Sequence, residues 1–144
     1  MRRAYLDTNI FIYSLVGKNE KSDFCKKILY AVAKKEIEGL TSVLTWDELI
    51  YNLSKIYNLS KFINKKIIIE EGEKFLRFPN LMLIDVNKKV IDKAQVLIKK
   101  YELNPRDAIH VATAILQNCE LIISYDSDFK KIKEIKTLKP EEIN

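Results

Sequence analysis

The 144-residue sequence is poor in the residues that interrupt regular structure or bind soft metals. It has three glycines, three prolines, two cysteines and one histidine. No Gly/Ser-rich or Pro-rich stretch marks a linker, and without a CxxC pair the ligands for a structural zinc site are missing. Cys25 and Cys119 lie far apart in periodic segments. We therefore expect two small apolar side chains in the interior rather than a disulfide.

Long apolar runs are also missing. No stretch approaches the roughly 18 residues of a membrane span, and the apolar segment after Arg2 and Arg3 ends at Asp7, too early for a signal peptide. We therefore expect a cytoplasmic protein that does not contact the membrane. With 47% hydrophobic and 31% charged residues, the chain has the composition of a globular protein. Its length fits one domain over residues 1–144.

The charge balance is only mildly positive. The net charge of +5 comes from 21 lysines and four arginines set against 20 acidic residues. Such an excess favours contact with phosphates, but most of these lysines are expected to solvate helix faces. Charge by itself therefore does not identify a partner.

Short apolar segments alternate with segments of helical periodicity. The expected strands are residues 3–6, 40–44, 81–84, 120–124 and an edge strand at 135–138. The expected helices are residues 9–16, 21–38 (stopped by Gly39), 45–57, about 59–75, 90–101 and 104–118, with a helical turn near Phe129. This alternation predicts an α/β, three-layer sandwich with a central, mainly parallel sheet of four to five short strands flanked by helices.

Four acidic residues occupy positions where predicted strands end or predicted helices begin. Asp7 follows the first strand, Glu48 lies in the first turn of the helix after the second strand, and Asp126 follows the strand at residues 120–124. Asp107 lies in the first turn of a later helix. The carboxyl ends of parallel strands share one edge, where ligands bind. We expect the acids to meet there, Asp107 included if its helix starts at the same rim.

Carboxylates gathered in one pocket repel each other unless cations neutralise them. Oxygen ligands without histidine or thiolate suit Mg²⁺ or Mn²⁺, as one or two ions, better than Zn²⁺. Such ions promote phosphodiester hydrolysis. Acyl transfer would instead need a nucleophile with a partnered base.

Each of these acids also has a purely structural interpretation. Asp7 suits a helix cap, and Glu48 stands three residues after Thr45, as in a capping box. Asp107 suits the positive end of a helix, and Asp126 suits a turn or cap. The convergence of all four on one edge favours the functional interpretation.

Three further acids serve as comparisons. Asp85 also follows a predicted strand and is expected to be a helix cap. Asp47 points about 100° away from Glu48 around the helix and is expected in solvent. For Asp128 three roles stay open, namely metal ligand, holder of a water molecule, or cap of the turn before Phe129.

The motifs resemble those of PIN domains. The run Leu6-Asp7-Thr8-Asn9-Ile10-Phe11 is similar to the opening motif of that family. The segment from Asp107 to Ala114 resembles its third acidic motif, and the segment from Ile122 to Phe129 resembles its fourth, with a Ser or Thr two residues before the acid. Glu48 lies in the helix where the family keeps its second acid. The resemblance covers nearly the whole chain, and the ordered set of motifs is more specific than any one of them.

The resemblance implies a parallel sheet between helices and Mg²⁺- or Mn²⁺-dependent endonuclease activity on RNA. It assigns Asp7, Glu48, Asp107 and Asp126 to the acidic cluster, with the choice between Asp126 and Asp128 as the fourth ligand open. The size of the chain and its Asp-Ala-Ile-His run resemble VapC-type toxins of prokaryotic toxin–antitoxin pairs, which implies a homodimer and a small antitoxin partner.

Neighbouring polar residues complete the predicted site. Thr8 and Ser124 fall where the family places hydroxyls that orient the acids or the substrate. Asn9 is expected to have the same kind of role, in orienting the acids or binding the substrate. Arg106 is the cation best placed to contact phosphates of an RNA substrate. Helix packing is the expected role of His110. Trp46 and Tyr51 are expected to pack beside the core or against a second subunit, in preference to presenting a stacking ring to a base.

Two other functions compete with the nuclease. A non-catalytic module of the same fold would bind RNA or a protein without cutting, and metal-dependent cleavage of RNA separates it from the enzyme. A haloacid-dehalogenase-like phosphohydrolase would use Asp7 as its nucleophile. That class needs a second acid two residues later, where this chain has Asn9.

Overall fold

A five-stranded parallel sheet forms the centre of the molecule in the computed structural model, which describes residues 1–58 and 62–143. Its strands are β1 (Arg2–Leu6), β2 (Ile37–Ser42), β3 (Met82–Ile84), β4 (Leu121–Ile123) and β5 (Lys136–Leu138). Their order is β3-β2-β1-β4-β5, and every neighbouring pair is parallel. The predicted parallel sheet is therefore confirmed. The chain turns to opposite sides from β1, which makes the carboxyl end of β1 the topological switch point.

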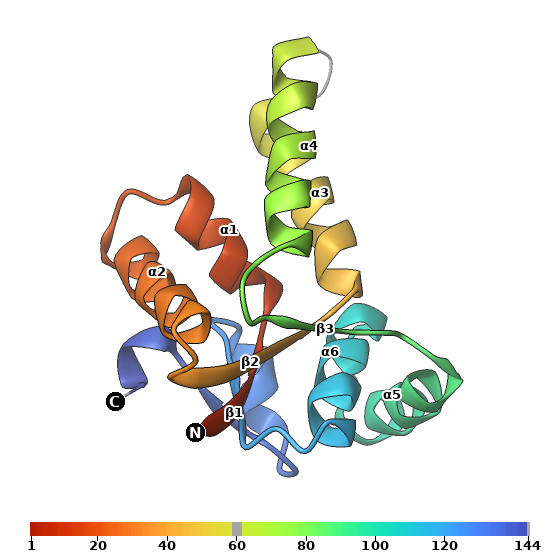
Figure 1. The fold of residues 1–144 in the computed structure, drawn as a ribbon. Helices are drawn as coiled ribbons and strands as arrows, with labels where there is room; N and C mark the ends of the chain where they lie inside the picture. Colours follow the sequence, from red (N-terminus) through yellow and green to blue (C-terminus); the bar gives the residue numbers. More distant parts are fainter. Residues whose placement is uncertain (59–61, 144) are drawn as a thin grey trace.

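Helices cover both faces of the sheet (Figure 1). The helices are α1 (Thr8–Val16), α2 (Glu20–Ala33), α3 (Leu44–Tyr57), α4 (Phe62–Leu76), α5 (Lys88–Tyr101) and α6 (Pro105–Leu116), with 3-10 turns η1 (Ser127–Lys131) and η2 (Pro140–Glu142). α1 and α2 lie on one face, α5 and α6 on the other, and α3 with α4 forms a pair that extends away from the body. This arrangement confirms the three-layer sandwich. Within the described residues, no helix has the length and apolarity to cross a membrane.

The two faces of the sheet bury separate cores, because side chains alternate along a strand. Leu6 and Ile123 pack with residues of α1, α2 and α3, whereas Tyr5 and Ile122 pack with residues of α5 and α6. Burial on both faces explains the apolar runs Ala4–Leu6 in β1 and Leu121–Ile123 in β4, the strands whose ends reach the candidate site. It also fixes the strand ends from which the candidate site is built.

The second helix ends earlier than its sequence pattern predicts. The prediction ran to residue 38 with Gly39 as the stop, but α2 ends at Ala33 and Lys35 turns the chain with a left-handed φ of 62°. Ile37 and Gly39 belong to β2, so the strand predicted at residues 40–44 lies at Ile37–Ser42. A Cβ on Gly39 would lie 2.6 Å from a methyl carbon of Val32. This glycine permits a close approach of helix to strand and does not end the helix.

Smaller differences concern the other helices. Asn87 caps α5 by accepting a hydrogen bond from the Val90 N–H at 3.0 Å, so the prediction of Asp85 as a cap was wrong. α6 begins after Asn104 with Pro105 in its first turn, as predicted, but ends at Leu116 rather than near residue 118. The predicted start of α4 near residue 59 lies outside the described residues. Both cysteines have free thiols, as predicted.

Candidate active site

Asp7 lies at the carboxyl end of the central strand with its oxygens held from several sides. Oδ1 accepts a hydrogen bond from the Thr8 N–H at 2.7 Å, which makes Asp7 the cap of α1. Oδ2 accepts from the Asn9 amide at 2.8 Å and from the Ser124 hydroxyl at 2.5 Å. Burial raises the pKa of Asp7, although the charge of His110 and the hydrogen bond from Ser124 oppose that shift. The carboxylate is therefore fixed in place, and the cap interpretation and a site role are compatible.

Ser124 joins the ends of β1 and β4. Its hydroxyl donates to Asp7 and accepts from the Asp126 N–H at 2.9 Å and from the Asn9 amide at 3.1 Å. The amide oxygen of Asn9 in turn accepts from the Tyr125 N–H at 3.4 Å. Asn9 and Ser124 thus set Asp7 and the Asp126 backbone relative to each other, in the region where the sequence predicted orienting groups.

Glu48 lies in the second turn of α3, not the first. The helix begins at Leu44, whose N–H donates to the Ser42 hydroxyl at 3.1 Å. Thr45 is buried and pairs with the Thr41 hydroxyl at 2.7 Å instead of capping the helix. The capping-box interpretation of Thr45 and Glu48 is therefore wrong, which leaves the Glu48 carboxylate available to the site.

A buried chain of hydrogen bonds ties Glu48 to the central strand. The Thr8 hydroxyl donates to Glu48 Oε1 at 3.2 Å, and His110 Nε2 contacts the same oxygen. His110 Nδ1 lies 2.6 Å from the Tyr5 hydroxyl, which accepts from the Ser42 N–H at 3.0 Å. His110 does pack inside the fold as predicted, at 1% exposure. It also orients the second acid, which sequence reasoning missed.

The contact between His110 and Glu48 favours the charged form of both. Burial opposes ionisation of Glu48, but the hydrogen bond and charge of His110 outweigh it and lower the pKa of Glu48. Burial likewise opposes protonation of His110, yet the hydrogen bond that His110 donates to Glu48 and the charge of Asp7 raise its pKa. The contact with His110 therefore favours the ionised form of Glu48.

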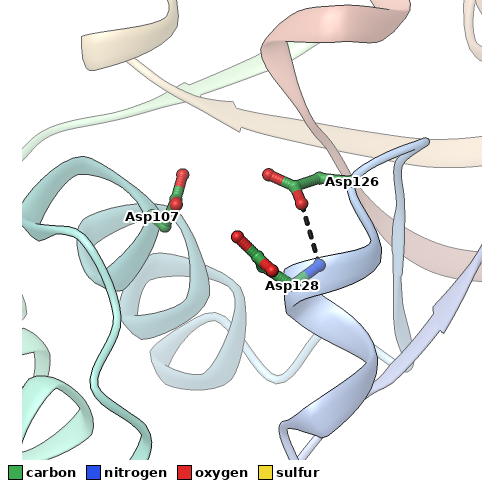
Figure 2. A group of neighbouring side chains, drawn as sticks. All are labelled: Asp107, Asp126 and Asp128. Atoms are coloured by element: carbon green, nitrogen blue, oxygen red, sulfur yellow. Dashed lines mark hydrogen bonds between the residues drawn. The ribbon is translucent and has the colours of Figure 1, made fainter.

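Three other carboxylates gather in one group (Figure 2), and the charges of His110 and Glu48 act on one of them, Asp107. Asp107, Asp126 and Asp128 each offer an oxygen, and these oxygens lie within 4.8 Å of one another. Asp107 comes from the first turn of α6, and Asp126 caps η1 by accepting from the Asp128 N–H at 2.8 Å. In Figure 2 all three side chains point into one space between α6 and η1. The first turn of α6, which carries Asp107, therefore lies at the same edge of the sheet as the residues that follow β4.

The surroundings of Asp107 disfavour its charged form. Burial raises the pKa of Asp107 to about 6, and the negative charges of Asp126 and Asp7 add to the shift. Such a pocket holds its full negative charge only when a cation neutralises it. Its ligands are all carboxylate oxygens, which fit a hard divalent ion such as Mg²⁺ or Mn²⁺.

Arg106 stands at the outer side of this pocket. Its side chain is 58% exposed and lies 3.7 Å from the Asp47 carboxylate, which is itself 56% exposed. The positive charge of Arg106 also contributes to the lowered pKa of Glu48. The predicted phosphate-binding cation is therefore close to the acids, but it shares a loose surface ion pair with Asp47.

Comparison with known proteins agrees with this geometry. The family model described as PIN domain matches residues 4–135. Ribonuclease VapC2 of Methanocaldococcus jannaschii is 28% identical over 142 residues, covering 90% of this chain and 89% of the relative. VapBC2 of Rickettsia felis, solved bound to a DNA fragment from its promoter, has a similar fold with a TM-score of 0.72 at 21% identity, over 95% of this chain and 98% of that one. A toxin–antitoxin complex from Klebsiella pneumoniae matches with a TM-score of 0.66 at 24% identity, over 97% and 99%. The chain belongs to the PIN domain family.

Proposed function

We propose that this protein is a metal-dependent endoribonuclease that hydrolyses RNA phosphodiester bonds and acts as the toxin of a toxin–antitoxin pair. The observation that carries the proposal is the cluster of Asp107, Asp126 and Asp128 oxygens within 4.8 Å of one another in a PIN-family fold. The charges of Asp7 and Glu48 act on the same Asp107 carboxyl, which supports a site shared by all of these acids. The likeness to Ribonuclease VapC2 over most of both chains supports RNA as the substrate.

In this proposal Asp7, Glu48, Asp107 and Asp126 hold Mg²⁺ or Mn²⁺ and carry the catalysis. Asp128 shares the space with Asp107 and Asp126, which supports it as an additional ligand. When bound, such an ion activates water as a nucleophile and offsets the negative charge that develops on phosphate oxygens.

The surrounding residues keep these acids in position before substrate arrives. Asn9 and Ser124 hold Asp7, while Thr8 and His110 hold Glu48. Groups of this kind, one step removed from the metal, fix the ligands and tune their basicity. Glu48, kept ionised by His110, is suited to accept a hydrogen bond from the attacking water.

A toxin needs a silencing partner. We expect a small antitoxin protein to bind this chain, and we expect the chain to form a homodimer in the cytoplasm. The fold shared with one member of the Klebsiella pneumoniae toxin–antitoxin complex supports an antitoxin.

Cleavage of RNA tests the proposal directly. The purified protein is expected to cut single-stranded RNA with Mg²⁺ or Mn²⁺, and chelation is expected to stop it. Asp7→Asn is expected to lower the rate by at least about 100-fold, because it removes a ligand charge, with an unchanged circular dichroism spectrum. Asp85→Asn is the matched control, since Asp85 also follows a strand but is exposed and does not belong to the cluster.

Two results would contradict the proposal. If the Asp7→Asn protein cut RNA as fast as the wild type, Asp7 would not be a catalytic residue and the proposed site would be wrong. RNA binding by the wild-type protein without cutting in either metal would favour a non-catalytic module. The dehalogenase-like alternative is disfavoured, because Asn9 donates a hydrogen bond to Asp7 where that chemistry needs a second acid.

A further inference from the structure

A charged and aromatic row runs along the exposed face of α3, beginning beside the acidic pocket. Asp47, Tyr51 and Lys55 are spaced four residues apart and therefore share one side of the helix. Tyr51 is 51% exposed, and the Lys55 ammonium lies 4.3 Å from the centre of its ring. Half of the Tyr51 side chain thus faces solvent in the single chain, so it does not pack inside the domain, and the predicted packing against a second subunit stays a prediction.

Arg106 links this row to the acids. It lies 3.7 Å from Asp47, at the start of the row, and directly precedes Asp107 in α6. The hydrogen bond and charge of Lys55, together with the charge of Arg106, lower the pKa of Tyr51, so both cations act on one ring. α3 begins next to α6 (Figure 1), where Glu48 and His110 join the two helices and Arg106 lies 3.7 Å from Asp47, so the start of the row lies close to the acids.

The apolar surface of α3 lies on a different side of the helix. Trp46 and Ile50 face α4, where they line a small depression of about 200 Å³ and border Gly72. The row that contains Tyr51 instead has charged residues one turn before and one turn after the ring. An isolated aromatic ring between cations suits a nucleic-acid strand better than an apolar protein surface.

We infer that Tyr51 and Lys55 of this α3 row, together with Arg106 of α6, bind the RNA strand where it leaves the acidic pocket. The Tyr51 ring stacks on a base, while Arg106 and Lys55 contact phosphates on either side of it. Stacking accepts any base and phosphate contacts carry no sequence information, so the α3 row positions the strand without selecting its sequence. The inference rests on the proposed ribonuclease function and names the substrate contacts of that site.

Asp47 opposes this binding. Its carboxylate pairs loosely with Arg106 at the start of the row, where its negative charge repels phosphates. The α3 row therefore predicts effects of opposite sign. Removing the ring or a cation weakens RNA binding, and neutralising Asp47 strengthens it.

Fluorescence anisotropy with a labelled, mixed-sequence, single-stranded RNA tests the inference in the presence of a chelator, so that binding is measured without cleavage. Tyr51→Ala is expected to weaken binding about tenfold, the loss typical of one stacked base, and Tyr51→Phe is expected to retain it. Lys55→Gln and Arg106→Gln are each expected to reduce the slope of log affinity against log salt by about 0.7, whereas Tyr51→Ala leaves the slope unchanged. Asp47→Asn is expected to raise affinity by about two- to threefold.

Tyr30→Ala provides a matched control. Tyr30 is 61% exposed and has the Lys34 ammonium 5.4 Å from its ring centre, so it repeats the tyrosine–lysine pair of α3. It lies in the last turn of α2, shortly before the amino end of β2. The acids of the candidate site instead lie at the carboxyl ends of the strands. Replacement of Tyr30 is expected to leave RNA affinity unchanged.

The inference fails if Tyr51→Ala binds RNA as tightly as Tyr30→Ala does. It fails equally if analytical ultracentrifugation shows that Tyr51→Ala dissociates an oligomer and that this dissociation accounts for the lost RNA affinity. In that case α3 would be an interface between subunits. The proposed function has a separate outcome. A wild-type protein that binds RNA through Tyr51 but never cuts it would support the α3 row and contradict the nuclease.

Discussion

At the scale of single residues, Asp107 shows that this site is arranged at the expense of stability. Burial and the nearby charges of Asp126 and Asp7 raise its pKa from 3.8 to about 6. A carboxyl whose pKa is raised on folding stabilises the fold most below its unfolded pKa, and that contribution is lost as the pH rises through the folded value. The metal-free protein therefore carries an unfavourable charge at Asp107 above about pH 6.

Asp107→Asn is accordingly expected to stabilise the metal-free protein while it abolishes cleavage. At pH 8 we expect the free energy of unfolding to rise by about 1 kcal/mol, a value reduced for partial solvent exposure and for the lost attraction to the positive end of α6. Below about pH 4 the two proteins are expected to unfold alike. Urea unfolding with a chelator at both pH values checks this, and a variant less stable than the wild type at pH 8 would contradict it.

The acids themselves were predictable from sequence, whereas their supports were not. Asp7, Glu48, Asp107 and Asp126 stand out because strand ends and helix starts can be located from periodicity and capping residues. The contacts of His110 with Tyr5 and Glu48 join positions 105 and 62 residues apart, which no local pattern reveals. The one available signal was spacing, because His110 lies three residues after Asp107 and so shares its helix face.

At the scale of elements, the order of strands and helices followed from the sequence, but some boundaries did not. Periodicity locates an apolar stripe, and it cannot show which neighbouring element the stripe will contact. Ile37 continues the helical stripe of α2 in the sequence, but in the fold it lies beside Arg2 in the sheet. Its pairing with β1 makes it part of a strand rather than of the helix. Gly39, which by local rules ends a helix, is buried in β2 against Val32.

Gly39→Ala is therefore expected to destabilise the fold through the contact between α2 and β2. The added Cβ would lie 2.6 and 2.8 Å from the two methyl carbons of Val32, a branched side chain that cannot turn away. We expect a loss of about 1–3 kcal/mol, typical of overpacking in a core. Gly72→Ala is the control: its Cβ would meet the flexible end of Ile50 at 3.0 Å, and the gain in helix propensity offsets that contact. Equal urea midpoints for the two variants would contradict this account.

At the scale of the whole molecule, the candidate site depends on the complete topology. The acids come from the end of β1, from α3, from the start of α6 and from the segment after β4, and only the folded chain brings them together. A ligand that binds the folded state alone stabilises it by mass action. The charge that destabilises the metal-free protein is therefore the charge that a bound cation would use.

Thermal unfolding measured with and without Mn²⁺ tests this coupling independently of RNA. At pH 7.5 and a metal concentration of about 100 times Kd, the ion is expected to stabilise the fold by about 2.7 kcal/mol and to raise Tm correspondingly. The shift is expected to shrink as the pH falls through about 6, because a proton on Asp107 then competes with the ion. Asp107→Asn is expected to lose most of the shift, and Asp85→Asn to keep it. A shift of equal size in the Asp107→Asn protein would mean that the ion binds elsewhere, and the assignment of the cluster would have to be given up.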